Sequence, residues 1–288
     1  MSENFRPVEK SREHFSTTIH RQNLSPCIVM GILNVTPDSF YDGSRRFNTD
    51  DAVKRGLEIW DSGALWLDIG GESTRPGAEP VDVEEELRRV IPVIKELKRV
   101  RPNGLISIDT RRPLVAIEAI KSGADMVNDV SGLSNSDMVE VILENKCAVC
   151  IMHMQGLPEN MQENPNYGDC IDEVSQFLFN QAEMLVSRGH SEELIIIDPG
   201  IGFGKKLVHN LDLLKNIEVL TKSKFSVMLG VSRKSMIGQI TGKEDPEDRL
   251  SGTLATSAFA FYNDIDIIRV HDIDQNVDLL KVLDKLEN

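Results

Sequence analysis

Hydrophobic and polar positions divide this chain into two alternating kinds of segment. Short blocks rich in Ile, Val and Leu end in polar residues, and longer stretches with apolar residues at helical spacing lie between them. We interpret eight blocks as β-strands: residues 27–34, 65–71, 105–110, 125–132, 148–154, 194–200, 226–233 and 266–272. Intervening stretches such as "VEEELRRVIPVIKELKRV", with its acids early and its bases late, indicate helices.

This alternation predicts a parallel sheet covered by helices. Eight strand–helix units favour an α/β fold with one domain, a closed (β/α)8 TIM barrel, and a doubly wound open sheet is the alternative. We expect the barrel, a ligand-binding domain, to occupy residues 25–288 and residues 1–24 to form an N-terminal extension.

Composition and charge narrow the class of protein. The 288 residues are 40% hydrophobic and carry a formal net charge of -14, which argues against nucleic acid or an anionic membrane surface as a partner. No apolar run approaches the roughly 18 residues of a spanning helix, and the polar start lacks the apolar centre of a signal peptide. We therefore expect a cytoplasmic protein that does not engage membranes.

The pair Cys147 and Cys150 has C-x-x-C spacing but lies inside a predicted strand. An odd separation along a strand points the two side chains to opposite faces. We interpret them as small apolar residues and not as a metal or redox site.

Polar side chains stand where most of the predicted strands end. In a barrel these ends meet at one rim, which is where such folds place their chemistry. A single polar strand end is commonly a helix cap or turn residue, but six or more in register are hard to explain that way, because unpaired buried charges are costly. The residues are Asn34, Asp68, Asp109, Asn128, His153, Asp198, Arg233 with Lys234, and Arg269 with His271.

The mixture of side chains indicates the kind of ligand. The period of two within a strand turns Asp109 and Asp198 inward, and these acceptors, with the amide of Asn128, suit a flat ring rich in nitrogen. The cations of Arg75, Lys234, Arg269 and His271 suit phosphate. We expect a heterocycle with a phosphate tail.

Eight ordered motifs then carry a resemblance to a known family. They are "MGILNVTPDSFYDG", "DIGGESTRPGA", "SIDTRRP", "VNDVSG", "HMQGLPENMQ", "DPGIGFGK", "GVSRKSMIG" and "RVHD". Together, from about residue 27 to the end, the chain resembles dihydropteroate synthases. The resemblance implies a TIM barrel, usually a homodimer, and a sulfonamide target. It also implies a transferase of folate biosynthesis that uses Mg²⁺ to join 6-hydroxymethyl-7,8-dihydropterin diphosphate to 4-aminobenzoate.

The resemblance also assigns roles to positions of this sequence. It implies pterin binding by Asp109, Asn128, Asp198 and Lys234. It implies diphosphate binding by Asn34, Arg75, Arg269 and His271, with Asn34 also at the metal. It implies a 4-aminobenzoate pocket of Phe40, Thr74, Pro76, Phe203 and Ser235. The catalytic set it implies is Asp42, Arg75, Asp109, Lys234 and Arg269, with Asp42 in a mobile first loop. Tyr41 and the run Ser44–Arg46 depart from the family pattern in that loop.

Two alternatives use the same barrel. A pterin-dependent methyltransferase needs no diphosphate site, so Arg269 and His271 count against it. A non-catalytic pterin-binding protein could lose the loop residues, and both loops are present here. Whether His153 or Lys205 contacts substrate is left open by the sequence.

Overall fold

In a computed structural model, the protein is described over residues 27–36, 49–72, 81–156 and 160–287. All eight predicted strands are present and pair in parallel in chain order, and β8 pairs with β1 to close a barrel. The predicted (β/α)8 barrel is confirmed, and the open-sheet alternative is wrong. The strands are β1 (Ile28–Asn34), β2 (Trp66–Gly70), β3 (Leu105–Asp109), β4 (Met126–Asp129), β5 (Ala148–Met152), β6 (Ile195–Asp198), β7 (Ser226–Leu229) and β8 (Ile267–Val270).

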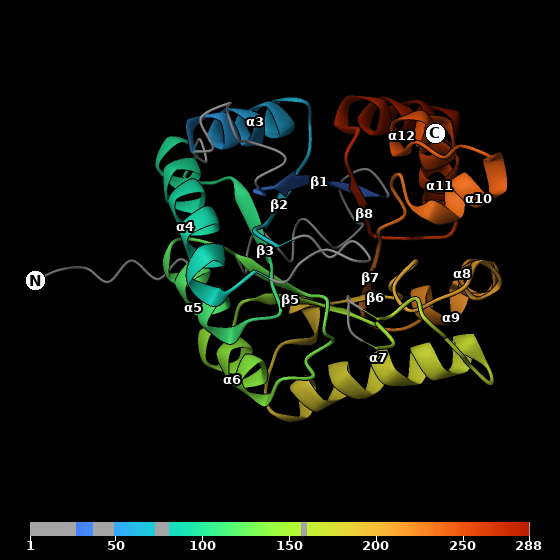
Figure 1. The fold of residues 1–288 in the computed structure, drawn as a ribbon, viewed down its shortest axis with the longest axis horizontal. Coiled ribbons are helices and arrows are strands. Elements are labelled where there is room, and N and C mark those ends of the chain that lie inside the picture. The colour runs from blue at the N-terminus through green and yellow to red at the C-terminus, as the bar shows by residue number, and fades with distance from the viewer. Residues whose placement is uncertain (1–26, 37–48, 73–80, 157–159, 288) are drawn as a thin grey trace, which may run out of the picture.

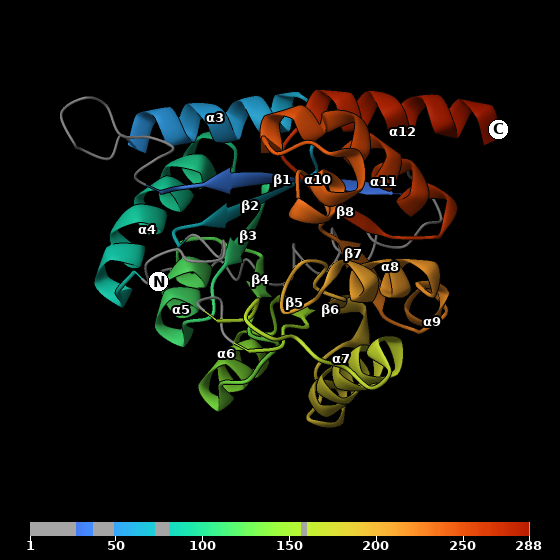
Figure 2. The same ribbon diagram turned by 45° about the vertical axis from the view of Figure 1, so that its right-hand side comes forward.

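Helices form a ring around the strands (Figure 1). Figure 2 shows α3 and α12 extending on the outside of β1, which both of them contact. The helices are α3 (Thr49–Asp61), α4 (Val83–Val100), α5 (Pro113–Lys121), α6 (Ser136–Asn145), α7 (Cys170–Ser187), α8 (Leu207–Lys215), α9 (Glu218–Thr221), α10 (Ser235–Thr241), α11 (Leu250–Tyr262) and α12 (Ile273–Glu287), with 3-10 turns at Glu192–Leu194 and Pro246–Arg249. Within these described segments, no helix is both long and apolar enough to cross a membrane.

Local sequence explains the start and the buried face of α4. The Asp82 side chain accepts a hydrogen bond from the Glu85 N–H at 2.8 Å, which caps the first turn. Val90, Ile94 and Leu97 recur at helical spacing and are fully buried against the barrel. Burial of this stripe, more than helix propensity, holds the helix in place.

The barrel has two apolar cores. The outer core lies between the strands and the helices, and a smaller inner core fills the barrel interior. Cys147 belongs to the outer core and Cys150 to the inner one, which confirms that they point to opposite faces. The inner core consists of Ile28, Met30, Trp66, Leu105, Met126, Ala148, Cys150, Leu194, Ile196, Met228 and Ile267.

On five strands, the next inward-facing residue after the inner core, two positions closer to the carboxyl end, is polar. Successive inward positions are two residues apart along a strand, so each polar side chain stands above an apolar one. The pairs are Trp66 and Asp68, Leu105 and Ser107, Met126 and Asn128, Ile196 and Asp198, and Ile267 and Arg269. The apolar floor therefore supports a polar layer facing the carboxyl ends of the strands.

The domain boundary predicted at residue 25 stays a prediction, because the described part of the chain begins at Cys27. The expected extension of residues 1–24 lies outside the described residues.

Candidate functional site

Arg269 links the buried carboxylate of Asp68 to the half-buried carboxylate of Asp109 at the centre of the polar layer. Its Nε donates to Asp68 Oδ2 at 2.6 Å, and its Nη2 donates to Asp109 Oδ2 at 2.8 Å. Strands β2 and β8 both pair with β1 and not with each other, so the side chain crosses the barrel interior past β1. Burial opposes its charge, but Asp68 and Asp109 hold the pKa of Arg269 above its ordinary value. The guanidinium therefore stays charged inside the barrel.

Asp109 is a carboxyl group that titrates near neutrality. Burial raises its pKa to about 7, and the nearby charge of Asp68 adds to this, while Arg269 opposes it. Groups with such perturbed pKa values are concentrated at functional sites. The predicted inward direction of Asp109 is confirmed.

Asn128 is joined to the same network. Its Nδ2 donates to Asp68 Oδ2 at 3.2 Å, and its side chain is buried. Three buried oxygens in this part of the described chain have no hydrogen-bond partner: Asn128 Oδ1, Asp68 Oδ1 and Ser107 Oγ. Because a buried polar atom without a partner is costly, these acceptors suit a ligand that brings N–H donors.

Asp198 and Lys234 face the other side of the cluster. Asp198 Oδ1 accepts from the Gly200 N–H at 2.7 Å, and burial raises the pKa of this carboxyl. Lys234 Nζ donates to the carbonyl of Ile201 and lies 4.4 Å from the centroid of the Phe203 ring. Burial lowers the pKa of Lys234 to about 8. An ammonium over an aromatic face is attracted to it.

Gly230 keeps the space between these groups open. A methyl group there would lie 3.8 Å from Asp198 Oδ2, 3.9 Å from Arg269 Cβ and 4.0 Å from Lys234 Nζ. Asp198 from β6, the stem of Arg269 from β8 and Lys234 from the turn after β7 thus surround one point.

Two predicted rim residues lie differently from Lys234. Arg233, with a backbone φ of +59°, pairs with Asp272 and Glu247 and so turns away from the cluster. His271 Nδ1 lies 3.0 Å from Ser232 Oγ, which also accepts from the His271 N–H at 3.2 Å. The turn after β7 therefore sends one cation outward and one inward.

Lys205 and His153 form a separate buried pair that is hydrogen-bonded to the main chain. Lys205 Nζ lies 2.9 Å from His153 Nδ1 and donates to three carbonyls, those of His153, Gly200 and Phe203, at 3.0–3.2 Å. Burial lowers the pKa of Lys205 to about 7 and that of His153 to about 3. The imidazole is therefore neutral, and the pair fastens the segment after β5 to the segment after β6.

Arg112 fastens the two flanks of the segment after β2. It pairs with Glu72 at 3.0 Å and with the buried Glu86, and it donates to the carbonyl of Val81. The Val81 N–H donates to Glu72 Oε1 at 3.1 Å. Burial raises the pKa of Glu86. Burial also acts to raise the pKa of Glu72, but the bonds and charge of Arg112 outweigh it and the pKa of Glu72 is lowered.

Of the remaining predicted site residues, the structure describes some and not others. Asn34 ends β1 on the same inward face as Met30 and is half-buried. Ser235 is exposed and begins α10. The predictions for Phe40, Asp42, Thr74, Arg75 and Pro76 fall outside the described residues.

Asp68 is among the polar strand ends predicted from the sequence, but no binding role was predicted for Asp68 or Ser107. Both are fully buried and face each other in register on β2 and β3. The signal was available, because each stands two residues after an inward apolar residue, as Asp198 does.

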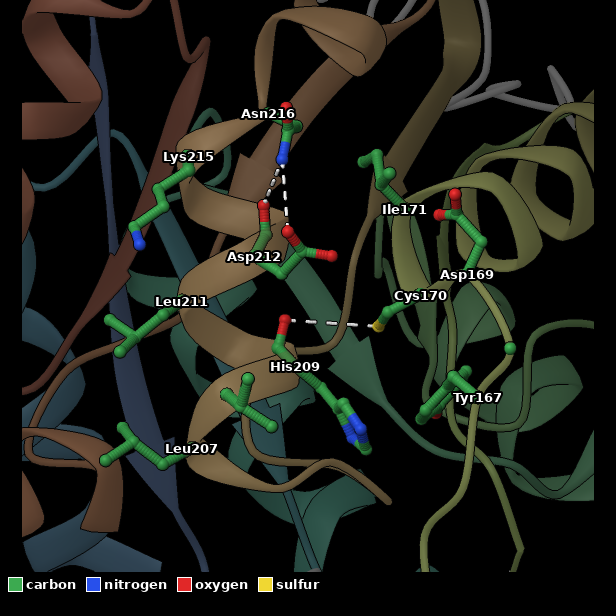
Figure 3. A pocket seen from close by; sticks show the side chains of 12 residues that line it. Tyr167, Asp169, Cys170, Ile171, Leu207, His209, Leu211, Asp212, Lys215 and Asn216 are labelled. Carbon is green, nitrogen blue, oxygen red and sulfur yellow. Dashed lines mark hydrogen bonds between the residues drawn. The ribbon is translucent and has the colours of Figure 1, made fainter.

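A hollow lies between the start of α7 and α8 (Figure 3). It has a volume of about 810 Å³. Cys170 Sγ contacts the His209 carbonyl at 3.9 Å, and Asn216 Nδ2 donates to the Asp212 carbonyl at 2.9 Å. Among the described residues that line this hollow, none is a predicted site residue and none carries a buried acceptor without a partner, so we place the chemistry at the barrel rim.

Comparison with known proteins shows the family of the chain. Residues 30–271 match a family model described as pterin binding enzyme. The chain is 44% identical to the dihydropteroate synthase of Escherichia coli strain K12 over 262 residues, which is 91% of this chain and 92% of that protein.

Solved structures agree as well. The Xanthomonas albilineans dihydropteroate synthase with 4-aminobenzoic acid has a TM-score of 0.85 and 41% identity, covering 91% of this chain and 93% of that one. The same enzyme in complex with 7,8-dihydropteroate has a TM-score of 0.82 and 37% identity, covering 94% and 95%. The motifs, the closed barrel and these matches agree over most of the sequence, and the chain belongs to the dihydropteroate synthase family of pterin-binding enzymes.

Proposed function

We propose that this chain transfers the dihydropterin methylene of 6-hydroxymethyl-7,8-dihydropterin diphosphate to the amine of 4-aminobenzoate. The products are 7,8-dihydropteroate and diphosphate. One observation carries the proposal: acceptors for a ring and cations for an anion form one cluster. Hydrogen bonds through Asp68 and Arg269 join Asn128 to Asp109, and Asp198 and Lys234 lie beside the stem of Arg269 at Gly230. The relatives that were solved with 4-aminobenzoic acid and with 7,8-dihydropteroate support it.

The ring is proposed to lie against Asp109, Asn128, Asp198 and Lys234. Asn128 Oδ1 has no partner in the described chain, and Asp198 uses Oδ1 for the Gly200 N–H, so Oδ2 is the oxygen directed toward the cluster. Carboxylates near the ring would also stabilise the positive charge that develops when the leaving group departs.

The diphosphate is proposed to be held by Arg269, His271 and Asn34, together with Arg75. Its departure builds negative charge on phosphate oxygens, and preformed cations such as the Arg269 guanidinium stabilise that charge without reorganisation.

Mg²⁺ is proposed to bind at Asn34. An amide oxygen is a ligand that Mg²⁺ accepts, and this metal usually combines one or two protein oxygens with substrate phosphates and water. Over residues 27–36, 49–72, 81–156 and 160–287, no group of three His, Cys, Asp or Glu could hold a metal by itself, which fits that arrangement. When bound, Mg²⁺ would neutralise charge on the leaving diphosphate.

The 4-aminobenzoate is proposed to lie beside Phe203 and Ser235, with Phe40, Thr74 and Pro76 completing the pocket. Its neutral amine already has a free lone pair, so the chain needs to position it and not to deprotonate it. Asp42 and Arg75 are proposed to act from the two loops over the site. A homodimer in the cytoplasm is also proposed, on the family resemblance.

The experiment is to incubate the chain with the dihydropterin diphosphate, 4-aminobenzoate and Mg²⁺ and to quantify diphosphate and dihydropteroate. Equal amounts of the two products are expected. Folded protein that binds the pterin but yields no product would favour the binding-only alternative.

A matched pair of variants tests the location of the site. Asp198→Asn removes a carboxylate from the rim, and Asp212→Asn removes one from the hollow between α7 and α8. We expect Asp198→Asn to lower turnover at least about 100-fold and Asp212→Asn to leave it nearly unchanged. The reverse result would mean that the rim is not the site.

A further inference from the structure

We infer that Asp68 is a positioning residue that orients both the amide of Asn128 and the guanidinium of Arg269. This inference rests on the proposed function, since it assigns to one buried carboxylate the alignment of the ring-binding and the anion-binding groups. Asp68 itself is not required to touch either substrate.

The geometry centres on a single oxygen. Asp68 Oδ2 accepts from Arg269 Nε at 2.6 Å and from Asn128 Nδ2 at 3.2 Å. The Asp68 side chain is fully buried in the middle of β2, on the inward face. Strands β4 and β8 are not neighbours, and this oxygen links the side chains of Asn128 and Arg269 across the barrel.

The contact fixes which way the Asn128 amide faces. An ionised carboxylate only accepts hydrogen bonds, so the atom of Asn128 that meets it must be the NH₂ group. A rotated amide would set two oxygens against each other. The amide oxygen is therefore the atom presented elsewhere, and Oδ1 is buried without a partner in the described chain. Asn128 is thereby set as an acceptor for a ring N–H.

The same carboxylate fixes which edge of Arg269 is used. Asp68 takes Nε and Asp109 takes Nη2, which lie on one side of the planar guanidinium. The Nη1 end is directed away from both carboxylates. That end is suited to an oxygen of the leaving diphosphate.

Loss of the Asp68 acceptor oxygen should weaken the binding of both the pterin and the diphosphate. The first test replaces Asp68 with Leu, which has a similar size and no acceptor, and with Asn, which keeps an acceptor oxygen and removes the charge. The probes are 6-hydroxymethyl-7,8-dihydropterin and inorganic diphosphate, each titrated by calorimetry.

We expect Asp68→Leu to lower the affinity for both probes by at least about 10-fold, and Asp68→Asn to restore most of it. Asn128→Ala, the comparison variant, should weaken only the pterin probe. If Asp68→Leu binds both probes as the wild type does, the inference is wrong. If Asp68→Asn is as weak as Asp68→Leu, orientation by an acceptor is also refuted.

A swap keeps the inference testable if Asp68→Leu does not fold. Asn128→Asp alone sets two carboxylates against each other and should lose pterin affinity. Asp68→Asn combined with Asn128→Asp puts an amide N–H against the new carboxylate, so it should recover part of the lost pterin affinity. It should not recover diphosphate affinity, because an NH₂ group then stands where Arg269 Nε needs the shared acceptor oxygen. Additive effects of the two changes would overturn the inference. Failure of the wild type itself to bind the dihydropterin would instead reject the proposed function.

Discussion

Replacing Arg269 with Met should destabilise the fold in a way that depends on pH. Met retains much of the stem length but leaves Asp68 and Asp109 without the cation that bridges them. The bridge is largely buried, with Asp68 0% and Arg269 20% exposed. Removing one partner of a buried ion pair costs about 3–5 kcal/mol, and we expect that loss in the free energy of unfolding at pH 8.

The pH dependence follows from Asp109. Its pKa is about 7 in the folded protein and about 3.9 in an unfolded chain, so over that range the folded state holds a proton that the unfolded state lacks. This contribution to stability is full at low pH and is lost as pH rises through about 7. Without Arg269 the pKa rises further, because the charge that opposed the shift is gone.

The deficit of Arg269→Met should therefore grow above pH 7 by up to about 1.4 kcal/mol per pH unit. Below about pH 6, Asp109 is protonated in both proteins and the deficit should be smaller and constant. Urea unfolding at pH 6, 7, 8 and 9 measures it, and buried Trp66, in the inner core beneath Asp68, provides the fluorescence signal.

Arg188→Met is the matched control. Arg188 and Glu140 pair at 2.9 Å but are 43% and 52% exposed, so the loss should stay below about 1 kcal/mol and should not vary over this pH range. A deficit for Arg269→Met as small as this, or one that does not change with pH, would refute the reasoning about the buried bridge.

Two further predictions concern the segment after β6. Lys205→Met leaves three carbonyls without their donor, so the free energy of unfolding should fall by about 2–4 kcal/mol, whereas Lys206→Met, at the exposed neighbour, should cost under about 0.5 kcal/mol. Urea unfolding compares the two variants, and equal losses would mean that the bonds of Lys205 contribute little. Gly200→Ala adds a methyl group 1.9 Å from the His153 carbonyl oxygen at a φ of +65°, so it should lower the free energy of unfolding by at least about 3 kcal/mol. Gly189→Ala, with a φ of +90° and no atom within 4 Å of the added methyl, should lower it by about 1–2 kcal/mol. Similar melting temperatures for the two variants would show that the close approach at Gly200 is unimportant.

Strand number and the inward direction of Asp109 and Asp198 were predictable because they depend on local periodicity. Closure was favoured only by the count of eight strand–helix units, and the open sheet stayed an alternative until the pairing of β1 with β8 was seen. A period of two places Asp109 with Ser107 and Leu105, whatever lies on the neighbouring strands. The resemblance added which of these residues to expect at a pterin site, and the assigned roles stay predictions.

The contacts that join the site were not predictable in the same way. Arg269 reaches Asp68 across β1, and that distance depends on barrel curvature, which no single strand encodes. Arg233 and Lys234 are adjacent cations, yet a left-handed backbone at Arg233 sends them to different partners. Lys205 is held by carbonyls, and main-chain acceptors leave no mark in a sequence.

The apolar inner core has a kinetic consequence. Met30, Trp66 and Met228 help to close the amino-terminal half of the barrel, so a ring seated on Asn128 has no exit beneath it. Substrates and products must then enter and leave through the same opening, at the carboxyl ends of the strands. A molecule that binds second therefore blocks the release of the molecule that bound first. Excess aminobenzoate should therefore slow the escape of a bound pterin without competing for its place.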